Sequence, residues 1–179
     1  DIGANNVILT VTDANSNTST STAVVTVADI ISPAAVAQNI TVYIDASGNA
    51  TIVAADVNNE SADNCTSVTL AASPTDFTCA DVGTNNVTLT VTDGSGNTST
   101  AVAVVTVADT TSPTASAQNI TVYLDASGNA SIVAADVDNG SANNCTSVIL
   151  AASPTAFTCA NIGTNNVTLT VTDGSGNTS

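Results

Sequence analysis

The chain repeats itself with a period of 80 residues, and successive copies align without a gap. Residues 30–80 match residues 110–160 at 40 of 51 positions, and residues 81–99 match residues 161–179 at 17 of 19 positions. A sequence that returns this closely at a fixed period is typical of an array in which each copy is one structural unit. We therefore predict nearly identical units, so that a feature of one copy recurs one period later.

Ser-Pro pairs mark the predicted junctions between copies. They occur at Ser32-Pro33 and Ser112-Pro113, each shortly after a long strand-like segment. On this basis residues 30–109 form one complete unit. Residues 1–29 are expected to be the last strands of a preceding unit, and residues 110–179 a unit that lacks its last strand. The sequence is thus expected to be a window on a longer array.

Alternation of apolar and polar residues dominates each copy. In the segment 86–93, Val87, Leu89 and Val91 point to one side and threonines to the other, as in a strand with one buried face. Short segments of this kind, separated by turn sequences, predict an all-β fold built as an antiparallel two-sheet sandwich. The predicted strands are residues 39–45, 50–57, 67–72, 77–82, 86–93 and 98–108.

The charge of the chain excludes several classes of function. The sequence holds 15 acidic residues and no Lys, Arg or His, so its formal net charge is -15. Nucleic acids and anionic membranes attract basic side chains, so we expect neither as a partner. No apolar run approaches the roughly 20 residues that span a bilayer, so no membrane insertion is expected. Acid–base catalysis commonly uses His or Lys, and we therefore predict that the protein is not an enzyme.

Several sequence blocks resemble a known family. The blocks are D-N-C, S-P-T-x-F, G-T-N-x-V-T-L-T-V-T-D-x-x-G-N and V-x-V-A-D. They are similar to the hyalin-repeat group of immunoglobulin-like domains, and to repeat arrays of giant surface adhesins in Bacteroidetes, including gliding flavobacteria. The resemblance implies tandem immunoglobulin-like β-sandwich domains in an extracellular or cell-surface fibre that extends and adheres. Its implied partners are copies of itself, with glycans or a cell surface as further candidates.

Each copy carries two cysteines, and their spacing is the same in both copies: Cys65 and Cys79, then Cys145 and Cys159. Because no His or C-x-x-C accompanies them, disulfides in an oxidising extracellular compartment are expected rather than a zinc site. The simplest connectivity joins Cys65 to Cys79 and Cys145 to Cys159, which would add roughly 3 kcal/mol of stability per bond. A covalent link between chains is the alternative.

Calcium is the expected cofactor, because it prefers oxygen ligands and would offset the acidic charge. One group of candidate ligands lies at strand ends beside the predicted junctions, with Asp93 and Asp109 preferred and Asp13 and Asp29 their equivalents. A second group has the alternating spacing of a calcium loop and consists of Asp56, Asp63, Asp136 and Asp138. The alternative is that these residues form turns through hydrogen bonds to the backbone.

Candidate glycosylation sites are Asn-x-Ser/Thr sequons and one Asp-Thr sequence similar to the O-glycosylation sequence of Bacteroidetes. They are Asn39, Asn64, Asn86, Asn97, Asn119, Asn144, Asn166 and Thr110. A chain this rich in Asn, Ser and Thr also produces sequons by chance. The threonines that alternate in Thr88–Thr92 suggest an alternative function, a carbohydrate- or ice-binding module, although Thr also favours strands for steric reasons.

Overall fold

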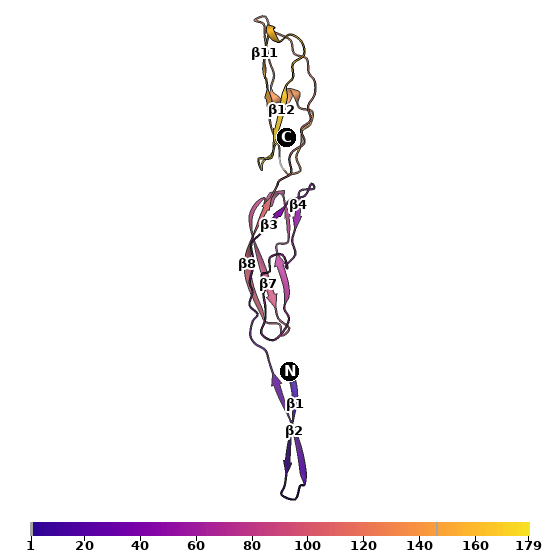
Figure 1. Ribbon diagram of the computed structural model, residues 1–179, viewed down its shortest axis with the longest axis vertical. Coiled ribbons are helices and arrows are strands. Elements are labelled where there is room, and N and C mark those ends of the chain that lie inside the picture. Colours follow the sequence, from indigo (N-terminus) through magenta and orange to yellow (C-terminus); the bar gives the residue numbers. More distant parts are fainter. Residues whose placement is uncertain (1, 146) are drawn as a thin grey trace. The chain divides into compact units, whose positions relative to one another are not determined.

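A computed structural model describes residues 2–145 and 147–179 of the chain, which is mostly β (Figure 1). Its internal contacts divide the chain into two compact parts that do not coincide with the sequence copies, and we call these parts unit 1 and unit 2. Unit 1 comprises Asp1–Gln38, Val53–Ser73 and Thr88–Ala103, and unit 2 comprises Asn39–Ile52, Pro74–Val87 and Val104–Ser179. Each unit therefore contains one of the two predicted junctions together with residues from the copies on both sides of it.

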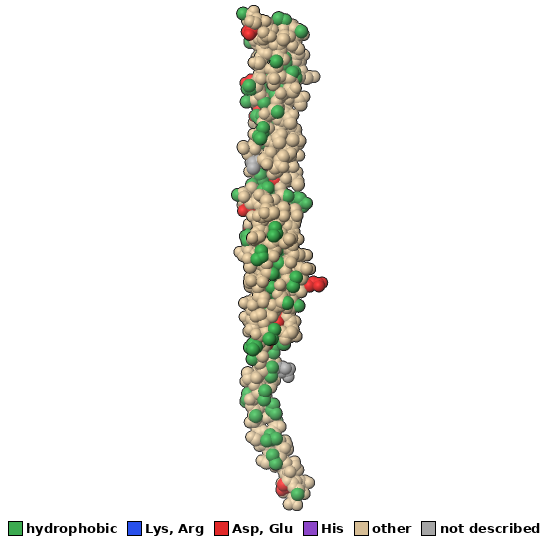
Figure 2. Space-filling view, turned by 90° about the vertical axis from the view of Figure 1, so that its left-hand side faces the viewer, with side chains coloured by type: hydrophobic (Ala, Val, Ile, Leu, Met, Phe, Trp, Pro, Cys, Tyr) green, Lys and Arg blue, Asp and Glu red, His purple; other side chains and the backbone are tan. Residues whose placement is uncertain are grey.

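The first two strands form an antiparallel hairpin. β1 (Gly3–Thr12) pairs with β2 (Thr18–Val27) over its whole length, and neither strand has another partner among the described residues. The turn forms because Asp13 Oδ1 accepts hydrogen bonds from the backbone N–H groups of Asn15 (2.9 Å) and Asn17 (2.8 Å). Many apolar side chains of this hairpin are exposed, as the green atoms at the lower end of Figure 2 show.

Residues 30–109 contain two sheets. The larger has the order β3–β8–β7–β5, and the smaller pairs β4 with β6 in antiparallel fashion. β5 and β7 are antiparallel, whereas β3 and β8 run parallel, so the expectation of purely antiparallel pairing is wrong for β3. The long connection between β3 and β8 permits the parallel arrangement. The strands are β3 (Ile40–Tyr43), β4 (Asn49–Thr51), β5 (Thr69–Ser73), β6 (Asp76–Thr78), β7 (Gly83–Thr92) and β8 (Thr98–Ala108).

In residues 30–109, the alternation of apolar and polar residues along the strands determines which side chains form the core. The prediction for β7 is confirmed, because Val87, Leu89 and Val91 are fully buried while the residues between them are exposed or half-buried. β8 buries every second residue in the same way, at Ala103, Val105 and Val107. Ala50 of β4 and Phe77 of β6 are also buried, so both sheets contribute apolar side chains.

Two predicted strands are shorter than expected because local side-chain caps end them. The strand predicted for 50–57 stops at Thr51, and Asp56 Oδ2 then accepts the Val53 N–H at 2.8 Å to close a turn. The strand predicted for 77–82 stops at Thr78 and passes into the 3-10 turn η1 (Cys79–Asp81). A reciprocal cap holds η1, since the Thr78 N–H donates to Asp81 Oδ2 at 2.8 Å.

Residues 110–179 repeat part of this arrangement. The elements are β9 (Asn129–Ser131), the short helix α1 (Ala134–Val137), β10 (Ile149–Ser153), β11 (Ala156–Thr158), the 3-10 turn η2 (Cys159–Asn161) and β12 (Thr168–Thr172). β9 pairs with β11 and β10 pairs with β12. Phe157 of β11 lies in one apolar cluster with Ala152 of β10 and Leu169 of β12, so the two sheets pack against each other.

Candidate functional site: the junctions between copies

Each junction is built on an Asp-x-x-x-Asn turn that holds the end of the preceding copy. At junction 2, around residues 109–113, Asp173 Oδ1 accepts hydrogen bonds from the Ser175 and Asn177 backbone N–H groups, both at 2.9 Å. The Asn177 side chain donates to Asp173 Oδ2 at 2.9 Å and to the Asp109 carbonyl at 3.1 Å. The turn of one copy therefore binds the last residue of the copy before it.

Junction 1, around residues 29–33, uses the same contacts one period earlier. The Asn97 side chain donates to Asp93 Oδ2 at 2.7 Å and to the Asp29 carbonyl at 3.3 Å. Partial loss of solvation favours the neutral form of Asp93, but hydrogen bonds from Asn97 and Ser95 outweigh it and lower the pKa of Asp93. The same balance lowers the pKa of Asp173 at junction 2. Both turn carboxylates are thus stabilised in the ionised form.

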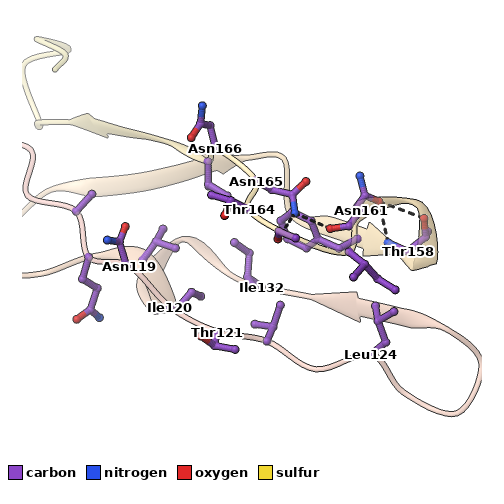
Figure 3. Close-up of a pocket in the computed structure, with 18 residues that line it drawn as sticks. Asn119, Ile120, Thr121, Leu124, Ile132, Thr158, Asn161, Thr164, Asn165 and Asn166 are labelled. Carbon is purple, nitrogen blue, oxygen red and sulfur yellow. Dashed lines mark hydrogen bonds between the residues drawn. The ribbon is translucent and has the colours of Figure 1, made fainter.

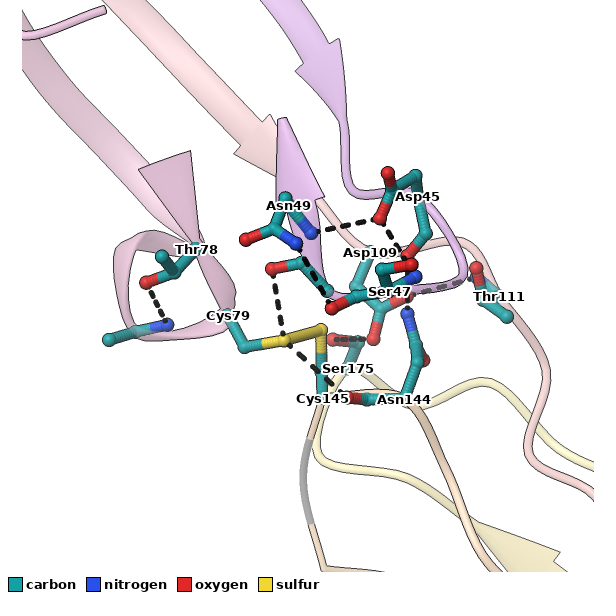
Figure 4. Close-up of a disulfide and its surroundings, with 12 residues drawn as sticks. Asp45, Ser47, Asn49, Thr78, Cys79, Asp109, Thr111, Asn144, Cys145 and Ser175 are labelled. Atoms are coloured by element: carbon teal, nitrogen blue, oxygen red, sulfur yellow. Dashed lines mark hydrogen bonds between the residues drawn. A yellow bond between two sulfur atoms is a disulfide. The ribbon is translucent and has the colours of Figure 1, made fainter. Parts of the chain in front are cut away.

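A disulfide crosses junction 2 and joins Cys79 to Cys145 (Figure 4). The two Cα atoms are 5.1 Å apart, and the residues are separated by 66 positions in the sequence. Cys79 belongs to η1 in one copy, and Cys145 belongs to the loop before β10 in the next copy. The adjacent Asn144 side chain donates to the Asp45 carbonyl at 3.0 Å. Successive copies are therefore joined covalently and by hydrogen bonds.

Gly48 makes room for the bond. A Cβ atom at this position would lie 2.7 Å from Cys79 Sγ, and the backbone φ of +80° is one that L side chains rarely adopt. Gly128 has the same relation to Cys159, with a φ of +79° and a distance of 2.7 Å from the Cβ position to the sulfur. In each copy, the sulfur of the second cysteine therefore packs against a glycine in the turn after the first strand-like segment.

The predicted local pairs, Cys65–Cys79 and Cys145–Cys159, are wrong. The Ser-Pro turn between the two cysteines of a copy is not a hairpin turn, because the strand before it and the strand after it belong to different sheets. β10 pairs with β12 and β11 pairs with β9, so the chain moves away from Cys145 and does not return to it. The observed bond joins two copies within one chain, so it matches neither the local pairing nor the alternative of a link between separate chains. The sequence alone does not distinguish pairing within a copy from pairing between copies, because four cysteines in a periodic array allow both.

Cys65 and Cys159 carry free thiols. Cys65 lies beside the junction 1 carboxylates, and the Asn64 side chain donates to its sulfur at 3.0 Å. Partial loss of solvation raises the pKa of the Cys65 thiol, and the negative charges of Asp29 and Asp63 raise it further. The equivalent of Cys65 in the next copy is Cys145, which is bonded.

Three carboxylates meet at junction 1. Asp29, Asp63 and Asp93 each offer an oxygen, and these atoms lie within 4.8 Å of one another. Asp29 Oδ2 and Asp63 Oδ1 are buried without a hydrogen-bond partner in the described residues. Asp109, the other preferred ligand, is not among these three clustered carboxylates. Sequence spacing missed Asp63 as a junction residue because its loop reaches the junction only in the folded copy.

The predicted metal ligands outside this cluster accept hydrogen bonds in local turns, and so does the second carboxylate oxygen of Asp63. Asp136 Oδ2 accepts the Val133 N–H at 2.7 Å, as Asp56 does for Val53, and Asp138 Oδ1 accepts the Ser141 N–H at 3.0 Å. Asp63 Oδ2 accepts the Cys65 N–H at 2.9 Å. Asp13 is exposed in the β1–β2 turn, where hydrogen bonds from the Asn17 side chain and backbone lower its pKa. The alternative interpretation as turn-forming residues describes these carboxylates well.

The candidate glycosylation sites differ in accessibility. Asn97 and Asn144 are half-buried, and their side chains donate the junction hydrogen bonds described above. Thr88 is exposed, while Thr90 and Thr92 are half-buried beside β5. The remaining candidate sites are exposed: Asn39, Asn64, Asn86, Asn119, Asn166 and Thr110.

No helix in the described part of the chain is long and apolar enough to cross a bilayer. The disulfide is consistent with an extracellular location. No protein-family model and no curated protein matches this chain.

Proposed function

We propose that the protein is a structural, load-bearing segment of an extracellular fibre or surface-adhesin stalk, made of tandem immunoglobulin-like copies and without catalytic activity. The Cys79–Cys145 bond is the observation that carries this proposal. A disulfide inside one copy would stabilise that copy alone, whereas this bond gives the array a second covalent connection between copies. A polymer under tension benefits from such a connection, and an isolated binding module does not need it.

The bond changes the route by which force passes along the chain. Tension applied at the two ends runs through the polypeptide to Cys79, across the disulfide, and onward from Cys145. The intervening residues 80–144 include β7, β8 and the linker of junction 2, and they carry no load while the bond is intact. The copies can therefore be held together even if weak hydrogen bonds at the junction open.

Two features of the sequence support an extracellular structural role. The chain has no Lys or Arg, so it offers no cleavage site to trypsin-like proteases outside the cell. Its resemblance to hyalin-type repeat arrays agrees with a fibre whose partners are further copies of itself and glycans or other groups on a surface. The lack of His, Lys and Arg gives no support to an enzymatic role.

Single-molecule stretching tests the proposal. The 179-residue chain is held near its two ends and pulled, first oxidised and then in a reductant. Reduction frees the 66 residue steps between Cys79 and Cys145, and we expect the fully extended length to grow by about 230 Å. The Cys145→Ser variant should show the longer extension without reductant, and Cys159→Ser should behave as the parent does. Equal lengths of oxidised and reduced chains would contradict a load-bearing disulfide.

We also propose that calcium binds at junction 1. Three clustered carboxylate oxygens repel one another, and the chain has no Lys or Arg to neutralise them. Within the part of the chain that the structure describes, Asp29 Oδ2 and Asp63 Oδ1 accept no hydrogen bond, which leaves them available to an ion. Extracellular modules commonly bind calcium with dissociation constants of roughly 10⁻⁴ to 10⁻³ M. A calcium ion bound to these carboxylates would stiffen junction 1.

Asp63→Asn is the variant that tests calcium binding, because junction 2 naturally has Asn143 at this position. Calcium at about ten times its dissociation constant should stabilise the parent by about 1.4 kcal/mol, and a chelator should reverse the gain. In a thermal melt, the Asp63→Asn variant should lose most of the stabilisation by calcium. The control variant Asp76→Asn removes one negative charge from an exposed site outside the cluster. It should keep the full stabilisation by calcium. A parent that does not respond to calcium would refute the site without affecting the load-bearing proposal.

A further inference from the structure

The sequence holds one Asn-Gly pair, Asn139-Gly140, in the loop that follows α1. Both residues are exposed, and a Cβ atom added to Gly140 would meet no other atom within 4 Å. The Asn139 backbone N–H donates to the Ser116 carbonyl at 2.8 Å, whereas its side-chain amide makes no hydrogen bond within the described residues. The side chain can therefore turn toward the Gly140 nitrogen, which no side chain shields.

The preceding copy has Asn59-Glu60 at the same place. Asn59 is exposed too, and its backbone N–H donates to the Val36 carbonyl at 2.9 Å, the equivalent of the bond to Ser116. Glu60 has a φ of +61°, and Gly140 has a φ of +81°. The two loops thus share their exposure and their backbone arrangement, and they differ in whether a side chain follows the asparagine.

We propose that Asn139 is a modification site, at which the chain itself converts the asparagine to isoaspartate or aspartate; the inference goes beyond the proposed fibre function. The Gly140 nitrogen gives its proton to hydroxide and attacks Asn139 Cγ. A bond between this nitrogen and Cγ forms, the bond from Cγ to the amide nitrogen breaks, and ammonia leaves with a proton from water. Proximity favours this step, because both groups belong to neighbouring residues of one loop. Water then opens the cyclic imide at either carbonyl, and a carboxylate replaces the amide.

Two other asparagines of this copy are held by hydrogen bonds. Figure 3 shows the Asn165 side chain, which donates to the Asn161 carbonyl at 2.7 Å, and the Asn161 side chain, which accepts the Thr158 N–H at 2.9 Å. Each would have to break such a bond before it could turn toward the next backbone nitrogen. Asn161 also precedes Ile162, whose branched side chain crowds that nitrogen. Neither residue therefore has the open surroundings of Asn139.

Asp93-Gly94 and Asp173-Gly174 could close the same ring, with water in place of ammonia as the leaving group. That route requires a protonated carboxyl, because an ionised carboxylate is a poor electrophile. Although partial loss of solvation acts in the opposite direction, the hydrogen bonds in their turns lower the pKa of Asp93 and of Asp173. Both side chains are therefore ionised at neutral pH and hold their turns instead of cyclising.

Asp138 controls how fast the ring can close. Its Oδ2 accepts the Gly140 N–H at 3.2 Å, and its Oδ1 accepts the Ser141 N–H at 3.0 Å. A hydrogen bond to a negative charge stabilises the protonated form of the Gly140 nitrogen, so this carboxylate slows the loss of the proton. The preceding copy has Asn58 here, and its uncharged Oδ1 accepts the Ser61 N–H at 3.1 Å. The loop can therefore keep its turn when the charge is removed.

The modified loop holds the segment that follows junction 2. Thr114 and Ala142 exchange backbone hydrogen bonds of 2.7 and 3.0 Å, and the Ser116 N–H donates to Ser141 Oγ at 3.0 Å. An isoaspartate at position 139 would route the main chain through the former side chain and add one carbon atom to it. The bonds made by the loop lie on both sides of this insertion, so they cannot all keep their geometry. We expect residues 114–116 to loosen as the chain ages.

The test compares the parent with two reciprocal variants of the full chain, Gly140→Glu and Glu60→Gly. Each chain is incubated at mildly alkaline pH and then reduced, and its chymotryptic peptides are weighed and labelled with an isoaspartyl methyltransferase. The parent should gain the mass of one amide-to-acid exchange at Asn139. Gly140→Glu should lower the rate there by a factor of about ten or more, and Glu60→Gly should create a second reactive site at Asn59.

Both variants use backbone conformations that already occur in the chain, because Glu60 and Gly140 both have a positive φ. Circular dichroism checks that each variant is folded. A third variant, Asp138→Asn, keeps the turn of the preceding copy and removes the charge. It should speed the conversion of Asn139 several-fold.

Hydrogen exchange in residues 114–116 should be faster in converted chains than in Gly140→Glu chains kept under the same conditions. Equal conversion of Asn139 and Asn59 in the parent, or an unreactive Asn59 in Glu60→Gly, would overturn the proposed site. A slower reaction in Asp138→Asn would refute the role of Asp138, and unchanged exchange would refute the loosening of the segment. None of these results depends on the stretching experiment.

Discussion

Cys145→Ser should lower the free energy of unfolding by about 4 kcal/mol. The bond closes a loop of 66 residues, and the chain-entropy estimate for a loop of this length gives about 4 kcal/mol at 25 °C. For a chain of this size the corresponding fall in melting temperature is roughly 8–16 °C. The measurement is guanidinium denaturation of the oxidised parent and variant at low protein concentration.

Cys159→Ser is the matched control for this experiment. It makes the same chemical change at a cysteine that is free in the chain, so its unfolding midpoint should remain close to that of the parent. Reduction of the parent should reproduce the Cys145→Ser result and should leave that variant unchanged. If both serine variants unfold alike, the Cys79–Cys145 bond does not stabilise the folded chain.

Leu89→Ala should destabilise its copy by about 3 kcal/mol, whereas Leu169→Ala should cost about half as much. The two leucines lie in identical segments, residues 84–93 and 164–173. Leu89 is fully buried in a sheet that includes β8, while Leu169 is half-buried in β12, whose strand partner among the described residues is β10 alone. Truncation therefore removes more packing contacts at Leu89.

Hydrogen exchange read by mass spectrometry measures each copy separately, so the two losses can be compared in one chain. Equal losses of stability in the two copies would contradict the difference in packing between them.

Local patterns in the sequence were sufficient to predict most strands. The alternation in residues 86–93 places Val87, Leu89 and Val91 on a buried face, and the predicted strand 98–108 coincides with β8. These predictions succeed because alternation and turn residues act over a few neighbouring positions. Strands 50–57 and 77–82 were predicted too long, since side chains of Asp56 and Asp81 cap the backbone there and compete with strand pairing.

The pairing partners were decided by the tertiary structure. A spacing of 14 residues suggested a Cys65–Cys79 bond, but the chain passes from one sheet to the other between these residues, and the sulfurs instead meet across copies. The clustering of Asp63 with Asp29 and Asp93 likewise depends on how a loop of one copy packs on the end of another. The period determines that such contacts recur, whereas only the folded chain determines which residues make them, because their free energy comes from groups far apart in the sequence.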